Sequence, residues 1–94
     1  MIAGAYEWDD AKAASNLAKH GVSFEVAILA FNDPGAVRVI DSRRDYGEQR
    51  INLFARLPSD GQALVVVCHV QRERIRIISA RFANRRERAL HLPG

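Results

Sequence analysis

Among its 94 residues the sequence has one cysteine, no long apolar run and no glycine-rich phosphate loop. The single cysteine, Cys68, excludes an internal disulfide and fits a reducing compartment. No stretch approaches the roughly 18 consecutive apolar residues that a membrane-spanning helix needs. The first ten residues lack the basic flank and apolar core of a signal peptide. We therefore expect one soluble cytoplasmic domain over residues 1–94.

Residue patterns typical of metal and cofactor sites are also missing. His20, His69 and His91 lie far apart in sequence, and no Cys-x-x-Cys or His-x-x-x-His spacing occurs. The sequence therefore predicts no metal site and no cofactor. A nucleophilic pair of Cys68 and His69 is disfavoured, because neighbouring strand residues point to opposite faces of a sheet. We expect Cys68 to be a small buried residue and His69 to be structural.

Positive charge is concentrated near the C-terminus. Residues 72–88 hold seven arginines against two acidic residues, whereas residues 1–71 hold seven basic and nine acidic residues. Arginine supplies twelve of the fourteen basic side chains. Its planar guanidinium grips a phosphate with two parallel hydrogen bonds and stays charged at any working pH. A block of this kind indicates a polyanionic partner.

Two helices are predicted in the first third of the chain. The first begins near Asp10 with an aspartate cap, ends at Lys19 or His20, and is terminated by Gly21. Its predicted apolar stripe consists of Ala14, Leu17 and Ala18, and its polar face consists of Lys12, Asn16, Lys19 and His20. Ser23 caps the second helix, whose predicted core-facing stripe consists of Phe24, Ala27, Ile28 and Phe31.

The period then changes to two, which predicts four strands. They are expected over residues 36–40, 48–57, 64–70 and 74–82, with a turn at Pro58–Gly61. The run 64–70 is apolar throughout, so it is predicted to be central and covered on both faces. Asn84 can cap a short last helix that Pro93–Gly94 ends. The predicted fold is α+β: two N-terminal helices, a four-stranded mostly antiparallel sheet and a short C-terminal helix.

Strand alternation limits how the arginines can cooperate. Arg72, Arg74 and Arg76 have even numbers, so in a regular strand they point to the same face, whereas Arg81 has an odd number and points to the other face. Arg76 and Arg81 can line one groove only if the strand is bulged or ends near Ser79. Two alternatives stay open, because exposed arginines can simply keep one sheet face solvated and His20 can simply cap a helix.

These residues together resemble a known protein family. The matching motifs are Trp8-Asp9-x-x-Lys12-x-x-x-Asn16-x-x-Lys19-His20-Gly21-Val22-x-Phe24-x-x-Ala27, Asp33-Pro34, Glu48-x-Arg50, Ile75-Arg76-Ile77-Ile78-Ser79-Ala80-Arg81-x-Ala83 and Glu87-Arg88. The order and spacing of these motifs, which span nearly the whole chain, resemble those of the BrnT toxins of bacterial type II toxin–antitoxin modules. The resemblance implies a RelE-like fold and a metal-independent ribonuclease that blocks translation by cutting RNA. It also implies a BrnA-type ribbon-helix-helix antitoxin, through which the complex binds operator DNA.

The implied reaction needs a base, an acid and cations, because the RNA 2′-hydroxyl itself attacks the adjacent phosphate. The catalytic candidates are Arg76 and Arg81 for charge stabilisation, Lys19 and His20 as a cation or acid, and Glu48 as a base. The substrate-binding candidates are Arg50, Arg74, Lys12, Arg85 and Arg86. Two other function classes remain: a non-catalytic nucleic-acid-binding module, and a module that docks an acidic partner protein.

Overall fold

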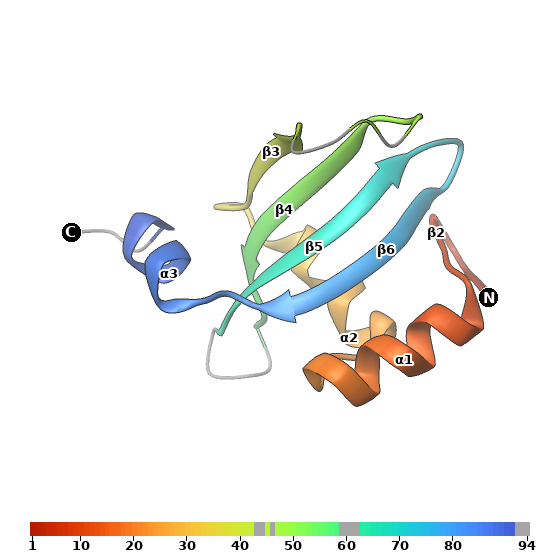
Figure 1. Ribbon diagram of the computed structural model, residues 1–94, viewed down its shortest axis with the longest axis horizontal. Helices are drawn as coiled ribbons and strands as arrows, with labels where there is room; N and C mark the ends of the chain where they lie inside the picture. Colours follow the sequence, from red (N-terminus) through yellow and green to blue (C-terminus); the bar gives the residue numbers. More distant parts are fainter. Residues whose placement is uncertain (43–44, 46, 59–62, 92–94) are drawn as a thin grey trace.

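The computed structural model describes residues 1–42, 45, 47–58 and 63–91. Of residue 91 it describes the backbone alone. Helices combine with a mostly antiparallel sheet, which confirms the α+β class (Figure 1). Most of the predicted turn at Pro58–Gly61 and all of the predicted stop at Pro93–Gly94 lie outside the described residues.

The sheet has six strands, so the prediction of four was wrong. The four expected strands form consecutive antiparallel pairs: β3 (Val37–Asp41), β4 (Arg50–Arg56), β5 (Leu64–Gln71) and β6 (Ile75–Phe82). Two N-terminal strands, β1 (Ile2–Ala3) and β2 (Tyr6–Glu7), extend the sheet because β2 pairs in parallel with β6. The resulting order is β1-β2-β6-β5-β4-β3. Residues 64–70 of β5 are buried throughout, as predicted for a central strand.

Helix α1 (Asp10–His20) begins and ends where the sequence predicts. The Asp9 carboxylate accepts hydrogen bonds from the backbone N–H groups of Ala11 and Lys12, at 2.8 and 3.1 Å. These contacts satisfy two of the N–H groups that every helix leaves unpaired at its start. Gly21 closes the helix in the left-handed conformation, with φ 74°, and donates its N–H to the carbonyl of Leu17.

The predicted orientation of α1 was wrong. Ala14, Leu17 and Ala18 are exposed, with Leu17 50% accessible, while Asn16 from the supposed polar face is buried. The Asn16 amide donates to the carbonyls of Val22 and Ala80, at 3.0 and 2.8 Å, and accepts the Ala80 N–H at 3.1 Å. Three hydrogen bonds offset the cost of burying this amide. Asn16 thereby fastens α1 to the backbone of β6.

Helix α2 (Phe24–Ala27) continues directly into the 3₁₀ helix η1 (Ile28–Asn32). The Ser23 hydroxyl caps α2 by accepting the N–H of Val26 at 3.1 Å, which confirms the predicted start. Phe24 and Ala27 are fully buried, and Ile28 and Phe31 pack against the same core, so the predicted stripe is also confirmed. The other side of this core comes from alternate residues of the strands, including Leu53, Val65, Val67 and Ile77.

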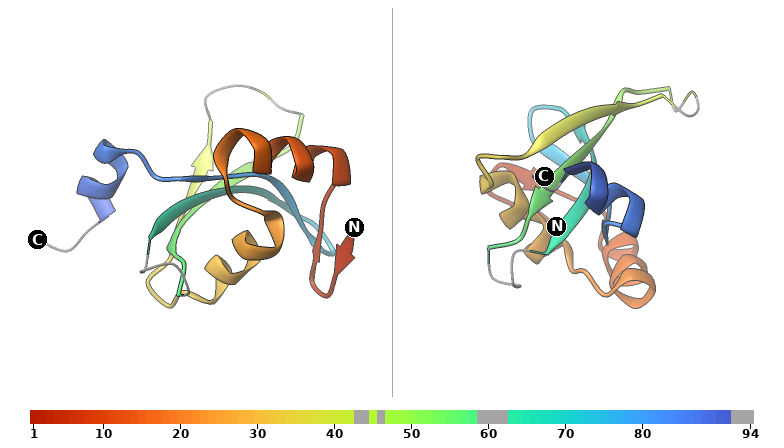
Figure 2. Two further views of the ribbon diagram at one scale, coloured as in Figure 1. Left: turned by 90° about the horizontal axis from the view of Figure 1, so that it is seen from below. Right: turned by 90° about the vertical axis from the view of Figure 1, so that its left-hand side faces the viewer.

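The sheet therefore has one face covered by α2 and η1 and one face, here called the open face, turned away from them. Figure 1 shows α2 behind the strands. Helix α3 (Arg85–His91) lies at the end of the molecule remote from the N-terminus, apart from the other helices (Figure 2). In the part of the chain that the structure describes, no helix is long and apolar enough to span a bilayer.

Candidate active site

A bulge in β6 determines which side chains reach the open face. Cys68 pairs with Ser79 but the next residue, His69, pairs with Ile77, so Ile78 is an extra residue in β6. Ile77 and Ala80 consequently both face the core although they are three positions apart. A bulge of this kind reverses the parity of the strand beyond it. Ser79 and Arg81 therefore share the open face with the arginine before the bulge, Arg76, whose pairing partner is Val70.

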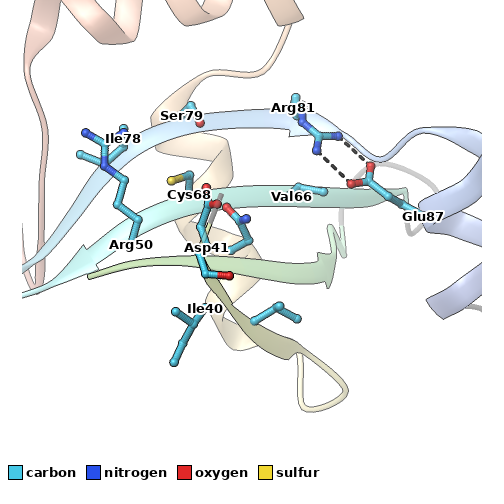
Figure 3. Close-up of a pocket in the computed structure, with 12 residues that line it drawn as sticks. Ile40, Asp41, Arg50, Val66, Cys68, Ile78, Ser79, Arg81 and Glu87 are labelled. Atoms are coloured by element: carbon cyan, nitrogen blue, oxygen red, sulfur yellow. Dashed lines mark hydrogen bonds and ion pairs between the residues drawn. The ribbon is translucent and has the colours of Figure 1, made fainter. Parts of the chain in front are cut away.

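The open face carries a cavity of about 390 Å³ between β3 and α3 (Figure 3). It is called the groove below. Charged, polar and apolar side chains from β3, β4, β5, β6 and α3, with Ser42 after β3, line it: Val39, Ile40, Asp41, Ser42, Arg50, Asn52, Val66, Cys68, Ile78, Ser79, Arg81 and Glu87. In Figure 3 Arg50 lies toward one end of the groove and Arg81 toward the other, with Cys68 and Asp41 between them.

Arg81 is held at its end of the groove by a carboxylate from α3. Its two terminal nitrogens donate to the two oxygens of Glu87, at 2.7 and 2.9 Å. The pair is partly buried, with 37% of the Arg81 side chain and 19% of the Glu87 side chain accessible. Two parallel, charge-assisted hydrogen bonds fix both the position and the plane of the guanidinium.

Arg50 and Asp41 face each other across β3 and β4, since the two residues pair in the sheet. Asp41 is 7% accessible. The Nε atom of Arg50 lies 3.5 Å from an oxygen of Glu48, so Glu48 adjoins the groove through Arg50 without lining it. Glu48 also accepts a 2.8 Å hydrogen bond from Arg72. This bond, followed by the charge of Arg72 and the contact with Arg50, lowers the pKa of Glu48 and makes its carboxylate a weak base.

The other arginine candidates on the sheet and α3 lie outside the groove lining. Arg76 lies on the open face but pairs with Glu7 of β2, at 3.6 Å. Arg74 is exposed and donates to the carbonyl of Gly4 at 3.3 Å. Arg85 and Arg86 are exposed on α3. The structure thus brings Arg50 and Arg81 to one groove and leaves Arg74, Arg76, Arg85 and Arg86 outside its lining.

The three α1 candidates are not in the groove either. Lys12 and Lys19 are exposed and His20 is half-buried. Asn16, on the same helix, bonds the backbone of β6. These bonds place α1 along the outer edge of β6, the edge that faces away from β5. A direct role for Lys19 or His20 in the groove would need the substrate to reach around that edge.

Cys68 and His69 point to opposite sides of the sheet, as strand alternation predicts. Cys68 lines the groove, whereas His69 is fully buried in the core with its ring 4.9 Å from that of Phe31. The Nδ1 atom of His69 lies 3.2 Å from the carbonyl of Val67, which supports its structural assignment. Burial lowers the pKa of His69; the contact with Val67 opposes this effect and the charge of Arg38 adds to it.

Several groove residues were missed as site candidates, namely Asp41, Asn52, Ser79 and Glu87. Asn52 and Ser79 are polar residues in strands, which look the same in a sequence whether they face solvent or a groove. The signal that identifies them is strand register: Asn52 directly precedes the core residue Leu53 in β4, and Cys68 pairs with both Asn52 and Ser79. Glu87 belongs to a motif of the resemblance, but its reach to Arg81 depends on α3. Among the described residues, no three His, Cys, Asp or Glu side chains are grouped so that they could hold a metal ion.

A family model and a solved structure match this chain. Residues 8–87 match the family described as ribonuclease toxin, BrnT, of type II toxin–antitoxin systems. Among solved structures, the chain is similar to the crystal structure of the Brucella abortus ribonuclease toxin, BrnT, with a TM-score of 0.62 and 23% sequence identity. The similarity covers 83% of this chain and 94% of that one, and at this identity it shows the fold alone. No curated protein sequence matches the chain.

Proposed function

Since the chain belongs to the family of BrnT ribonuclease toxins of type II toxin–antitoxin systems, we propose that it is a metal-independent endoribonuclease that blocks translation by cutting RNA. The observation that carries the proposal is the groove, in which Arg50 and Arg81 lie toward opposite ends of one cavity (Figure 3). Two guanidinium groups so placed can hold a bridging phosphate and its neighbour in an RNA strand.

The RNA supplies its own nucleophile in this mechanism. Attack of a 2′-hydroxyl on the adjacent phosphorus breaks the bond to the 5′-oxygen and leaves a 2′,3′-cyclic phosphate and a 5′-hydroxyl. Arg81 stabilises the negative charge that develops on the oxygens of the reacting phosphate, and Arg50 holds the neighbouring phosphate. The hydroxyl groups of Ser79 and Ser42 and the amide of Asn52 are placed to hydrogen-bond the ribose or phosphate.

Proton acceptance is assigned to carboxylates in and beside the groove. Asp41 is a sheet carboxylate that lines the groove and is our candidate to accept the 2′-hydroxyl proton, while solvent water supplies the proton that the leaving 5′-oxygen takes up. Glu48 is the weaker candidate, because Arg72 holds its pKa below the usual range. The exposed arginines on and near the open face, namely Arg74, Arg85 and Arg86, with Arg76 beside Glu7, extend the basic surface for the RNA backbone. Lys12, Lys19 and His20 extend it along the edge of β6.

The toxin family implies an inhibitory partner. We propose a BrnA-type ribbon-helix-helix antitoxin that neutralises the chain in the cytoplasm and brings the complex to operator DNA. We also propose that this fold is related to that of the RelE-like toxins.

The test is cleavage of end-labelled RNA by the purified chain, free of antitoxin and with a chelator present. We expect cleavage that leaves a 2′,3′-cyclic phosphate, and no cleavage of an oligonucleotide with 2′-deoxyribose throughout. Loss of one charge-stabilising donor typically costs roughly 10²–10³ in rate, so we expect a loss of that order in Arg81→Ala. Arg38→Ala is the matched control and should cleave normally, because Arg38 pairs with the core residue Leu53 and so lies on the opposite face.

Three results would contradict the proposal. The first is intact RNA both with and without added ribosomes, which, with salt-sensitive binding, would leave a nucleic-acid-binding module. The second is cleavage that the chelator abolishes. The third is full activity of a folded Arg81→Ala variant.

A further inference from the structure

We propose that Asn84 and Glu87 are positioning residues, which couple the start of α3 to the placement of Arg81 in the groove. The proposal concerns the geometry of the groove and rests on the proposed function for its effect on RNA cleavage. It assigns α3, which otherwise extends away from the sheet, a definite role (Figures 1 and 2).

The Glu87 carboxylate makes two kinds of contact at once. Oε1 accepts from Arg81 at 2.7 Å and from the backbone N–H of Asn84 at 2.9 Å, while Oε2 accepts from Arg81 at 2.9 Å. In return, the side-chain oxygen of Asn84 accepts the N–H of Glu87 at 2.8 Å. This reciprocal arrangement is a capping box, with Asn84 as N-cap and Glu87 three residues later. The carboxylate therefore cannot turn away from Arg81 without also breaking the cap.

The cap matters because α3 is short. Its seven residues, Arg85–His91, are too few to form a stable helix alone, and Leu90 is 74% accessible. The contacts that hold its first turn include the capping box, the Glu87–Arg81 pair and a 2.9 Å hydrogen bond from Arg88 to the carbonyl of Ala83. Formation of α3 and alignment of Arg81 are thus mutually dependent.

Arg81 benefits from this restraint because it has a long side chain that is more than one-third accessible. An unrestrained arginine samples many rotamers, and ordering it in the transition state would oppose catalysis. Glu87 orders the guanidinium before the substrate arrives. The opposite role, in which Glu87 competes with the phosphate for Arg81, predicts the opposite sign: removing the carboxylate would then raise activity.

The inference is tested with Asn84→Ala, Glu87→Ala and Glu87→Gln, assayed as full chains for kcat and KM on the labelled RNA. A small misplacement of a catalytic group can cost about 10²-fold, so we expect kcat to fall by roughly tenfold to hundredfold in both alanine variants, with KM little changed. Glu87→Gln should lie between wild type and Glu87→Ala because it keeps one acceptor. Asn84→Ser should recover most of the activity, because serine caps helices about as well as asparagine. Leu90→Ala, an exposed change in the same helix, is the matched control and should behave as wild type.

A spectroscopic readout separates this inference from the proposed function. In protein labelled with ¹⁵N-arginine, the bidentate pair should slow rotation of the Arg81 guanidinium and give resolved Nη–H signals. These signals should be lost in Asn84→Ala and retained in Asn84→Ser and Leu90→Ala. Their loss in Asn84→Ala supports the positioning role even if the wild-type chain cuts no RNA. An absence of RNA cleavage would then count against the proposed function alone.

A double-mutant cycle completes the test. In an Arg81→Ala background, Asn84→Ala should have no further effect on kcat, since it acts through Arg81. An equal effect in both backgrounds would overturn the inference. So would unchanged Arg81 signals in Asn84→Ala, or faster cleavage by Glu87→Ala.

Discussion

Asn16 gives the most direct test of how α1 and β6 are held together. Its replacement by alanine removes the partners of three buried backbone groups: the carbonyls of Val22 and Ala80 and the N–H of Ala80. A buried polar group left without a partner costs roughly 1–3 kcal/mol. Partial relaxation around the space left by the amide would offset some of this cost, and we expect Asn16→Ala to lower the free energy of unfolding by about 2–4 kcal/mol in total.

That loss is large for this chain. Stability of roughly 0.05–0.15 kcal/mol per residue gives about 5–14 kcal/mol for a domain of this size. One kcal/mol corresponds to about 4–8 °C in Tm for a domain of 60–100 residues, so the melting temperature should fall by roughly 8–32 °C. The measurements are urea unfolding followed by circular dichroism, and a thermal melt.

The control is Ser15→Ala, which changes an exposed neighbour in the same helix and should stay within about 0.5 kcal/mol of wild type. Asn16→Asp is a sharper comparison, because a carboxylate accepts the Ala80 N–H but cannot donate to the two carbonyls. It should be at least as destabilising as Asn16→Ala at pH 7 and should partly recover in acid, where a protonated carboxyl can donate. A loss below about 1 kcal/mol in Asn16→Ala would refute the reasoning, because leaving three buried polar groups without hydrogen-bond partners should cost more free energy than that.

Two further stability predictions follow from local geometry. Burial lowers the pKa of His69 in the folded protein, so the His69 imidazole binds a proton more readily in the unfolded chain. The free energy of unfolding should therefore fall as pH drops below about 6.5. His69→Leu should flatten that slope in urea titrations between pH 7.5 and 5, and an unchanged slope would contradict the assignment. Gly21→Ala should cost about 1–2 kcal/mol because φ is 74° at a site where a Cβ would meet no atom within 4 Å, so backbone strain alone is tested. Gly35→Ala, at a position without positive φ, is its control in the same unfolding assay, and equal losses in the two variants would exclude strain as the cause.

The sequence predicts the elements whose periodicity is long enough to be recognised. Strands β3–β6 each span five to eight residues, and the caps of α1 and α2 use residues with strong positional preferences. Strands β1 and β2 have two residues each, too few to show a period of two. β2 is a strand because β6, about 69 residues away in the chain, provides a partner for Tyr6 and Glu7, and β1 is a strand because it pairs with β2.

The orientation of α1 fails for a different reason. A periodicity argument places apolar side chains inward, so Ala14, Leu17 and Ala18 were expected in the core. In the fold an asparagine takes that place, because its amide can hydrogen-bond both backbone groups of Ala80 as a neighbouring strand would. This stabilisation depends on a contact between α1 and β6, and the hydrophobic periodicity of the helix carries no information about it.

The sequence could predict only those groove residues that are recognisable by residue type and motif. Arg50 and Arg81 stand out as cations in recognisable motifs, and both line the groove. Asp41, Asn52 and Ser79 became site candidates only when pairing put them on one face. Glu48, which precedes β4, lies outside the lining, beside Arg50 and Arg72.

The bulge at Ile78 resolves the conflict of parity that the sequence poses. In a regular strand, burying both Ile77 and Ala80 is impossible, since residues three apart face opposite sides. If Ala80 turned outward, Arg81 would enter the core. The free energy of burying an unpaired guanidinium there is far larger than that of leaving one residue out of the strand pairing. The extra residue therefore lets β6 keep both apolar residues inside and Arg81 in the groove.

Asn16 acts on the same part of β6. A bulge disrupts the ladder between strands locally, and beyond β2 the outer edge of β6 lies against α1 instead of another strand. The two hydrogen bonds from Asn16 to Ala80 satisfy the backbone there, two residues after Ile78 and immediately before Arg81. Arg81 is thus fixed from both ends, its backbone by α1 through Asn16 and its guanidinium by α3 through Glu87. Because the two restraints act on different atoms, loss of Glu87 should release the side chain without releasing the strand, whereas loss of Asn16 should loosen both.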